Sequence, residues 1–252
     1  MGTRDQEYMD RTEMEVAIEY AEIAAKYDVP VTLFITGRAA VEESDRVKRL
    51  AAMGNVEIGG HNYWAFSTSV HKMWRVVEKA TGGLVGSWNG PRAFQRFEIR
   101  RTIEVLNKRG GDVTAWRDHA YRHDQYTVEL LSEEGITHLS DTVGPDEKVR
   151  LEDSVTVIPV NTPPDHEHIY HAFRTPESDA IEEFEGPFGG ESVDAGEWIG
   201  WVGDYIETVD HEVMTVLAHP ACMWLADEFE AFEEMLQLLD KWEENAESIT
   251  AI

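Results

Sequence analysis

The chain has 252 residues and a formal net charge of −27 at pH 7, from 49 acidic and 22 basic side chains. A negative field of that size repels phosphate backbones and anionic lipid surfaces, so nucleic acid and membranes are poor candidate partners. The hydrophobic content of 42% is enough to fill a core, which excludes a disordered acidic tail.

The positive charge is carried mainly by arginine, with 15 Arg against 7 Lys. Together with the acid excess, this balance resembles proteins of salt-loving organisms, whose dense surface carboxylates are screened by concentrated salt. We therefore expect a halophilic source, with an ordinary acidic mesophilic protein as the alternative.

Cys222 is the single cysteine, so an internal disulfide is excluded, and no stretch reaches the roughly 20 apolar residues of a membrane span. The first residues, MGTRDQEYMDRTEM, are charged where a secretory signal peptide would be apolar. We expect a soluble, cytoplasmic protein, and the sequence leaves open whether it forms a homo-oligomer.

The first predicted elements are a helix followed by a strand. Residues 12–27 place apolar side chains at helical spacing, with Thr12 as the predicted N-cap and Glu15 as its capping-box partner. Residues 29–35 are a short run of β-forming residues, which is typical of a strand buried on both faces.

This alternation of helix and strand continues along the chain. Further helices are predicted near 41–53, 98–109, 124–134 and 226–243, further strands at 56–58, 113–116, 137–139, 155–160 and 213–217, and a last apolar run lies at 249–252. The period is that of β/α units, which close into a parallel sheet or barrel. Residues 161–195 are rich in Pro, Gly, Asp and Glu, and we interpret them as a loop insertion rather than a second domain.

Four ionisable residues follow predicted strands, namely His61, Arg117, Asp141 and His219. In parallel β/α folds the active site is built at the carboxyl ends of the strands. Each residue taken alone is better explained as a hydrogen-bonded structural residue. Together they favour a hydrolytic site, which needs a base, an acid and a charge stabiliser around one cavity.

The motifs VPVTLFITG, VEIGGHNYW, TAWRDHAY and TVLAHP, taken in this order, carry a family resemblance. Over roughly residues 5–225 the chain resembles the polysaccharide deacetylases of carbohydrate esterase family 4. The resemblance implies an α/β fold, a deformed (β/α) barrel of about seven parallel strands in a single domain over residues 1–252. It also implies metal-assisted hydrolysis of an N-acetyl group on an amino sugar, because a divalent metal polarises the carbonyl and activates water.

The resemblance assigns roles to individual residues. In the family, an Asp-His-His set holds the metal, a neighbouring Asp is the base and a histidine near the C-terminal end protonates the leaving amine. His61 matches the first metal histidine, Arg117 the arginine that orients the base, and His219 the acid. Asp141 matches, more loosely, an acidic residue that supports the acid.

Two positions depart from the family pattern. The second metal histidine of the family corresponds to Ala65, which cannot coordinate a metal. The strand that ends in paired aspartates would finish where this chain starts, which indicates either a missing first strand or an open barrel. Asp5 and Asp10 are the nearby aspartates, and because Asp10 precedes the capped helix, Asp5 is the predicted metal-ligating and catalytic carboxylate.

The lost histidine needs a substitute, and His119 is the best placed, two residues after Arg117 at a strand mouth. Asp5, His61 and His119 would supply one oxygen and two imidazoles, a set that Zn²⁺ accepts with a fourth position open. We expect a divalent metal, zinc, as the cofactor.

A second cluster, Asp165, His166, His168 and His171, also has metal-ligand residue types. Its spacing matches no tight ligand motif and it lies in an acidic loop, so we favour a solvated loop over a metal site.

The function that this pattern favours is hydrolysis of a carbon–nitrogen amide bond that is not a peptide, in a small N-acetylated sugar or a related molecule. A cytoplasmic enzyme would act on a soluble precursor rather than on a finished cell-wall polymer. Two alternatives stay open. One is a metal-independent hydrolase of ureides or cyclic amides, which the loss of a ligand at Ala65 favours. The other is an inactive carbohydrate-binding or interaction protein that retains His61, Arg117 and His219.

Overall fold

The computed structural model describes residues 4–82, 84, 87–177, 186–239 and 246–252. Its strands are β1 (Val31–Thr36), β2 (Val56–His61), β3 (Ala115–Trp116), β4 (His138–Leu139), β5 (Arg150–Glu152) and β6 (Val155–Val157). They form one sheet in the order β1-β2-β3-β4-β6-β5, in which all neighbours pair in parallel except β5 with β6. This confirms the predicted α/β fold with a mostly parallel sheet, consistent with a deformed (β/α) barrel.

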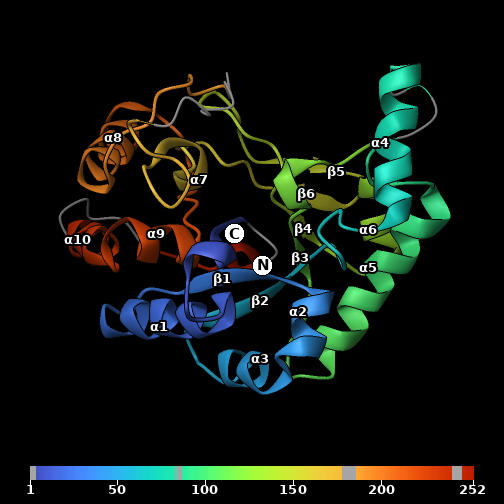
Figure 1. Cartoon of the computed structure of the whole chain (residues 1–252), viewed down its shortest axis with the longest axis horizontal. Helices are drawn as coiled ribbons and strands as arrows, with labels where there is room; N and C mark the ends of the chain where they lie inside the picture. Colours follow the sequence, from blue (N-terminus) through green and yellow to red (C-terminus); the bar gives the residue numbers. More distant parts are fainter. Residues whose placement is uncertain (1–3, 83, 85–86, 178–185, 240–245) are drawn as a thin grey trace.

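Helices surround this sheet (Figure 1). To its left in the figure lie α1 (Glu13–Lys26), α8 (Ala195–Thr208), α9 (Pro220–Asp227) and α10 (Glu230–Leu239). To its right and below lie α2 (Gly37–Glu42), α3 (Ser44–Ala51), α4 (Ser69–Thr81), α5 (Arg92–Asn107) and α6 (Thr127–Glu133). The short elements are α7 (Asp165–His168) and the 3₁₀ helices η1 (Arg4–Tyr8), η2 (His119–Tyr121) and η3 (Ile249–Ala251).

The start of α1 forms as its sequence predicts. The Thr12 hydroxyl accepts from the Glu15 N–H, and the Thr12 N–H donates to the Glu15 carboxylate, which together make a capping box. The Thr12 hydroxyl also donates to the Glu43 carboxylate at 2.6 Å, between α2 and α3. These contacts fix the start of α1, whose first two turns bring Glu13, Met14 and Ala17 to the main cavity.

Several predicted elements differ in extent. The helix predicted at 41–53 is two helices, α2 and α3, and the acidic helix predicted at 226–243 begins earlier, as α9 and α10. Residues 240–245 of that prediction lie outside the described residues. The last apolar run, at 249–252, contains the 3₁₀ helix η3. The insertion contains α7 and leads into α8, and residues 178–185 of it lie outside the described residues.

The segment 213–217 has strand composition but no strand ladder. Its backbone is held by side chains instead. The Asn161 amide donates to the Val213 carbonyl and accepts from the Thr215 N–H, both at 2.8 Å. The Thr162 hydroxyl donates to the Thr215 carbonyl at 2.8 Å. The buried side chains of Asn161 and Thr162 therefore replace a neighbouring strand, and the segment still delivers His219 to the carboxyl-end edge of the sheet.

Close packing of β2 against β3 depends on Gly60. A Cβ atom at Gly60 would lie 2.4 Å from a ring atom of the fully buried Trp116. Gly60→Ala should therefore lower the free energy of unfolding by about 1–3 kcal/mol, because a close-packed core does not accept an added methyl group without strain. Urea unfolding followed by circular dichroism measures this. Gly54→Ala is the control, since a Cβ there meets nothing within 4 Å, and an equal loss in both variants would contradict the packing argument.

Candidate active site

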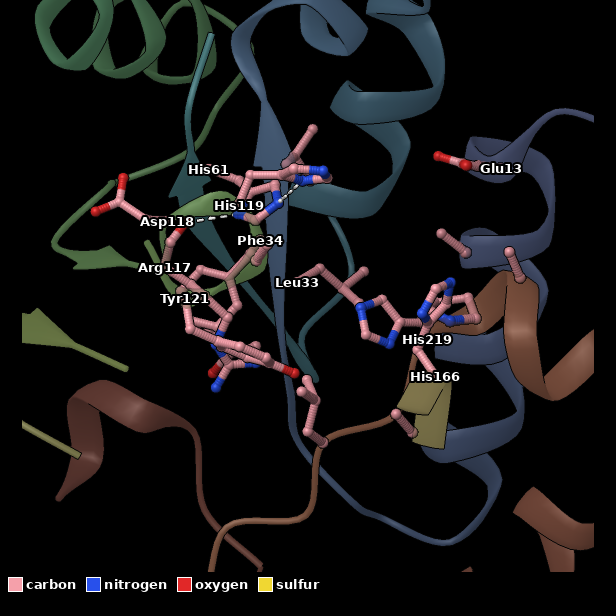
Figure 2. Close-up of a pocket in the computed structure, with 18 of the residues that line it drawn as sticks. Glu13, Leu33, Phe34, His61, Arg117, Asp118, His119, Tyr121, His166 and His219 are labelled. Atoms are coloured by element: carbon pink, nitrogen blue, oxygen red, sulfur yellow. Dashed lines mark hydrogen bonds between the residues drawn. The ribbon is translucent and has the colours of Figure 1, made fainter. Parts of the chain in front are cut away.

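A cavity of about 380 Å³ opens at the carboxyl ends of β1, β2 and β3. Its wall includes residues from η2, α7 and the start of α9, and its floor includes Leu33 and Phe34. Figure 2 shows two groups of imidazoles on either side of this floor, His61 with His119 and His166 with His219. The predicted residues His61 and His219 thus line one cavity, although 158 positions separate them in the sequence.

Strand pairing places His61 and Arg117 at the same edge. Gly60 lies opposite Trp116 in the parallel register of β2 and β3, and the Arg117 N–H donates to the Gly60 carbonyl at 3.0 Å. His61 and Arg117, which directly follow this pair, therefore both lie at the mouth of the cavity.

His61 and His119 form a hydrogen-bonded pair of imidazoles. The Nδ1 of His61 lies 2.6 Å from the Arg117 carbonyl, and its Nε2 lies 3.0 Å from the Nδ1 of His119. Burial, together with the neighbouring His119, holds the pKa of His61 well below its usual range, and burial lowers the pKa of His119 to about 4. Both rings are therefore neutral near pH 7, and both nitrogens of His61 are already engaged.

The low pKa of His119 predicts sensitivity to acid. The unfolded chain binds a proton at this ring below about pH 6.5, whereas the folded chain binds it only below about pH 4, so stability falls as the pH drops through that interval. For His119→Asn, we expect the loss of unfolding free energy between pH 7 and pH 4.5 to be smaller than in the wild type by about 2–3 kcal/mol. Urea unfolding at the two pH values measures this, and equal losses in the two proteins would refute it.

Arg117 is buried and points across the sheet to β4. Its Nε donates to the Ser140 carbonyl at 2.7 Å and one terminal nitrogen donates to the Ser140 hydroxyl at 2.5 Å. Its guanidinium carbon lies 4.6 Å from the centre of the Phe34 ring. Burial lowers the pKa of Arg117, but the ordinary pKa of arginine is so high that the side chain stays cationic. Arg117 therefore brings a positive charge to the cavity wall, and the contacts that hold it are to Ser140.

Asp141 supports the strand-end loop after β3. Its Oδ1 accepts from the Asp118 N–H at 2.8 Å, and its Oδ2 lies 3.6 Å from the Nδ1 of His123. Burial and the nearby Asp141 raise the pKa of Asp118, whose Oδ1 accepts from Asn62 and Trp116. The contacts of Asp141 are thus with the loop at 118–123 and not with His219, which was its predicted partner.

The partner of His219 is Asp165. The Nδ1 of His219 lies 2.7 Å from Asp165 Oδ1, and the backbone N–H of His219 donates to Asp165 Oδ2 at 2.6 Å. Burial alone would lower the pKa of His219, but Asp165 outweighs it and raises that pKa. Because Nδ1 is held by a fully buried carboxylate, Nε2 is the nitrogen that can meet a molecule in the cavity.

The residues around Asp165 are folded and buried, so the interpretation of this cluster as a solvated loop was wrong. Asp165, His168 and His171 are buried, and α7 carries the first two together with His166. His168 is held by the Glu191 carbonyl at 2.8 Å and by the Trp201 ring. Composition alone suggested a loop, but Asp5 and His219, from distant parts of the chain, pack onto it.

Asp5 lies beside His166 and His171. Its Oδ2 is 3.3 Å from the Nε2 of His166, and its Oδ1 is 3.4 Å from the Nε2 of His171. Burial would raise the pKa of Asp5, but the two imidazoles outweigh it and lower that pKa strongly. Among the described residues, this is the group of three whose potential ligand atoms all lie within 4.8 Å of one another.

The predicted metal set of Asp5, His61 and His119 is therefore not brought together. Asp5 pairs with His166 and His171, while His61 and His119 bond to each other on the other side of the cavity. The position of the second family ligand is Ala65, and His119 brings a second imidazole to His61 instead. Among the described residues, no carboxylate joins these two imidazoles in a group of three. The described residues there therefore do not make up a set of three metal ligands.

Sequence reasoning missed residues in and beside the cavity. Asp165, which holds His219 from outside the cavity lining, and His166, which is part of that lining, were assigned to a solvated loop. Glu167, which also lines the cavity, was given no role. The Oε2 of Glu167 is buried without a hydrogen-bond partner. The signal that pointed to them was the density of acidic and imidazole side chains in DHEHIYH, which local spacing did not resolve into a site. Phe34 and Tyr121 supply aromatic surface to the cavity.

Comparison with solved structures shows the same fold in proteins of low sequence identity. A Mycobacterium smegmatis protein assigned to the polysaccharide deacetylases aligns with a TM-score of 0.65 at 17% identity, covering 99% of this chain and 77% of that one. A peptidoglycan N-acetylglucosamine deacetylase aligns with a TM-score of 0.58 at 13% identity, over 96% and 83% of the two chains. A CE4 family pseudoenzyme from Bacillus anthracis aligns with a TM-score of 0.57 at 14% identity, over 95% of this chain and 61% of that one.

Searches by sequence give a family but no individual relative. No curated protein matches the chain. The family model described as polysaccharide deacetylase matches residues 9–139, just over half of the 252 residues. That segment runs from just before α1 through β4 and includes His61 and Arg117. The chain therefore belongs to the polysaccharide deacetylase family.

Proposed function

We propose that this protein hydrolyses the amide bond of a small N-acetylated sugar or a closely related molecule. The observation that carries the proposal is His219, whose Nδ1 is held by buried Asp165 and whose ring lines the cavity. An amine is a poor leaving group unless it is protonated as the carbon–nitrogen bond breaks, and an imidazole fixed in this way can deliver that proton from Nε2.

The cavity suits a small, neutral ligand. A volume of about 380 Å³ lies towards the lower end of the roughly 300–1,000 Å³ typical of small-molecule sites. Phe34 and Tyr121 offer apolar surface for the C–H face of a sugar ring, and Arg117 places a cation in the wall. The net charge of −27 disfavours strongly anionic substrates. These features favour a soluble sugar over a polymer chain.

Glu167 is the carboxylate that we assign to the base role in place of Asp5. Asp5 is fully buried against His166 and His171, whereas Glu167 lines the cavity beside His219. A base must come within hydrogen-bond reach of the water that it activates, and the place of Glu167 in the cavity wall supports this assignment.

The setting of the protein remains a prediction from its sequence. The described helices include none that is long and apolar enough to cross a membrane. The halophilic character and the cytoplasmic location inferred from the charge balance and the first residues stay predictions. The salt dependence of the thermal midpoint tests the first, since screening of a −27 charge should raise it.

The test of function is release of acetate from a panel of soluble N-acetylated amino sugars, measured with protein supplied with zinc and with protein treated with a chelator. We expect turnover of at least one sugar in the zinc-supplied protein. Ureides and cyclic amides belong in the same panel. Turnover of these alone, unaffected by the chelator, would replace the proposal by metal-independent amide hydrolysis. Binding of a sugar without any turnover would replace it by a carbohydrate-binding role.

A further inference from the structure

Three potential metal ligands converge beside the cavity from separate parts of the chain. Asp5 belongs to η1, His166 to α7, and His171 follows α7 in the insertion. Each oxygen of the Asp5 carboxylate faces one imidazole, at 3.3 Å for His166 and 3.4 Å for His171. The side chains of Asp5 and His171 are fully buried, and that of His166 is 26% exposed.

The polar atoms of this group lack hydrogen-bond partners. Both oxygens of Asp5 and the Nε2 atoms of His166 and His171 are buried without a partner among the described residues. A buried carboxylate is costly unless a cation faces it, which here is either a protonated imidazole or a metal ion. The separations exceed the roughly 2.7–2.9 Å of a charge-assisted hydrogen bond. They match the roughly 3.4 Å between two ligands of a tetrahedral zinc, each about 2.1 Å from the metal.

The hydrogen bonding of His171 indicates which of its nitrogens carries a proton. Its Nδ1 lies 2.7 Å from the Ile169 carbonyl, which can only accept, so Nδ1 is the donor. In the neutral ring, the Nε2 lone pair then faces the Asp5 carboxylate. Two lone pairs approach in this way only around a cation, either a proton or a metal. A ligating histidine usually donates its other N–H to a carbonyl or carboxylate, as His171 does.

The geometry points to a divalent transition-metal centre held by Asp5, His166 and His171, with zinc as the first candidate metal. This centre replaces the metal position that the family resemblance assigns to His61 and Ala65. The Asp-His-His composition is kept, but both imidazoles now come from the insertion at 161–195. One carboxylate and two histidines with an open fourth position make a ligand set that zinc accepts.

This centre adjoins the residues of the proposed reaction. His166 lines the cavity, and its ring centre lies 5.3 Å from that of His219. The catalytic part of the inference rests on the proposed function, in which a metal supplies Lewis-acid polarisation of the substrate carbonyl when bound. The binding of the metal itself does not depend on that function, and His166 is the ligand through which the centre meets the cavity.

The test is metal binding by the full chain, without reference to activity. Protein stripped with a chelator is dialysed against Zn²⁺ and analysed for metal content, and a parallel sample is titrated with Co²⁺ while its visible absorbance is recorded. We expect one equivalent of zinc and the absorbance of low-coordinate cobalt in the wild type. His166→Ala should lower the affinity at least tenfold, and Asp5→Asn should do the same. His61→Ala and His119→Ala should keep one equivalent.

Folding is checked separately, because Asp5 is buried. Far-UV circular dichroism establishes that each variant is folded, and zinc should raise the thermal midpoint of the wild type but not of His166→Ala. The partly exposed His166 is the variant least dependent on core packing. Full zinc content in folded His166→Ala, loss of zinc in His61→Ala, or no zinc in the wild type would each overturn the inference. Stoichiometric zinc without hydrolysis of any amide supports the centre and removes the proposed function instead.

Discussion

Replacing His219 with asparagine should lower kcat for amide hydrolysis by about 10²–10⁴-fold, which is the usual contribution of a positioned acid. The physical reason is the fixed orientation of the ring. Asp165 holds Nδ1 at 2.7 Å, so the proton on Nε2 is presented to the cavity and not to the protein. KM should change little, because the acid acts mainly as the bond to the leaving group breaks.

The nature of the leaving group separates this role from a merely structural one. A nitrophenyl ester needs no proton to expel its leaving group, so His219→Asn should retain far more activity on the ester than on the N-acetyl sugar. His211→Asn is the matched control, since that histidine bonds to the Pro145 carbonyl and lies outside the cavity lining. Equal losses on ester and amide would show that His219 does not act as the acid.

The part of this site that sequence predicted is the part encoded locally. His61 and Arg117 each follow a short apolar run, and such a run specifies both a strand and the end at which it stops. Parallel pairing then brings adjacent strand ends together, so the meeting of His61 with Arg117 followed from the pattern. The capping box at Thr12 is local in the same sense.

The part that sequence did not predict depends on contacts between distant segments. Whether Asp165 is solvated or buried is decided by His219, more than fifty positions away, and by the packing of α9. The segment 213–217 has the composition of a strand, yet the side chain of Asn161 supplies its hydrogen bonds. Sequence spacing cannot predict whether a strand or a side chain supplies these hydrogen bonds. The reason is that a side-chain amide offers the same kinds of donor and acceptor as a neighbouring backbone.

The same limit explains the choice between Asp141 and Asp165. Asp141 stands at a strand end, where a supporting carboxylate is expected, but its oxygen is taken by the Asp118 N–H. Asp165 stands in a segment of loop composition, but its two oxygens meet the two donors of His219. The position of a residue relative to a strand predicts where its backbone lies. Only the tertiary fold decides which hydrogen-bond donor its carboxylate reaches.

Asp165→Asn should therefore reduce kcat on the N-acetyl sugar by about 10²–10³-fold, whereas Asp141→Asn should reduce it less than tenfold. An amide in place of the Asp165 carboxylate offers one oxygen to two donors and turns its NH₂ toward the other, so one of the bonds to His219 is lost. The imidazole is then no longer held in the tautomer that carries a proton on Nε2, and a wrong tautomer alone can cost several orders of magnitude.

Asp165→Asn and Asp141→Asn should also differ in how much activity they lose on the amide and on the ester. Because Asp165 acts through His219, the loss in Asp165→Asn should fall mainly on the amide and spare the nitrophenyl ester, as in His219→Asn. The double variant with Asp165→Asn and His219→Asn should then have a kcat only slightly below that of His219→Asn alone, because the two residues act as one catalytic unit. Asp141→Asn should instead lower the free energy of unfolding by about 1–3 kcal/mol, because the buried Asp118 N–H loses its charged acceptor. A fall in kcat that is as large in Asp141→Asn, with the same preference for the ester, would return the supporting role to Asp141.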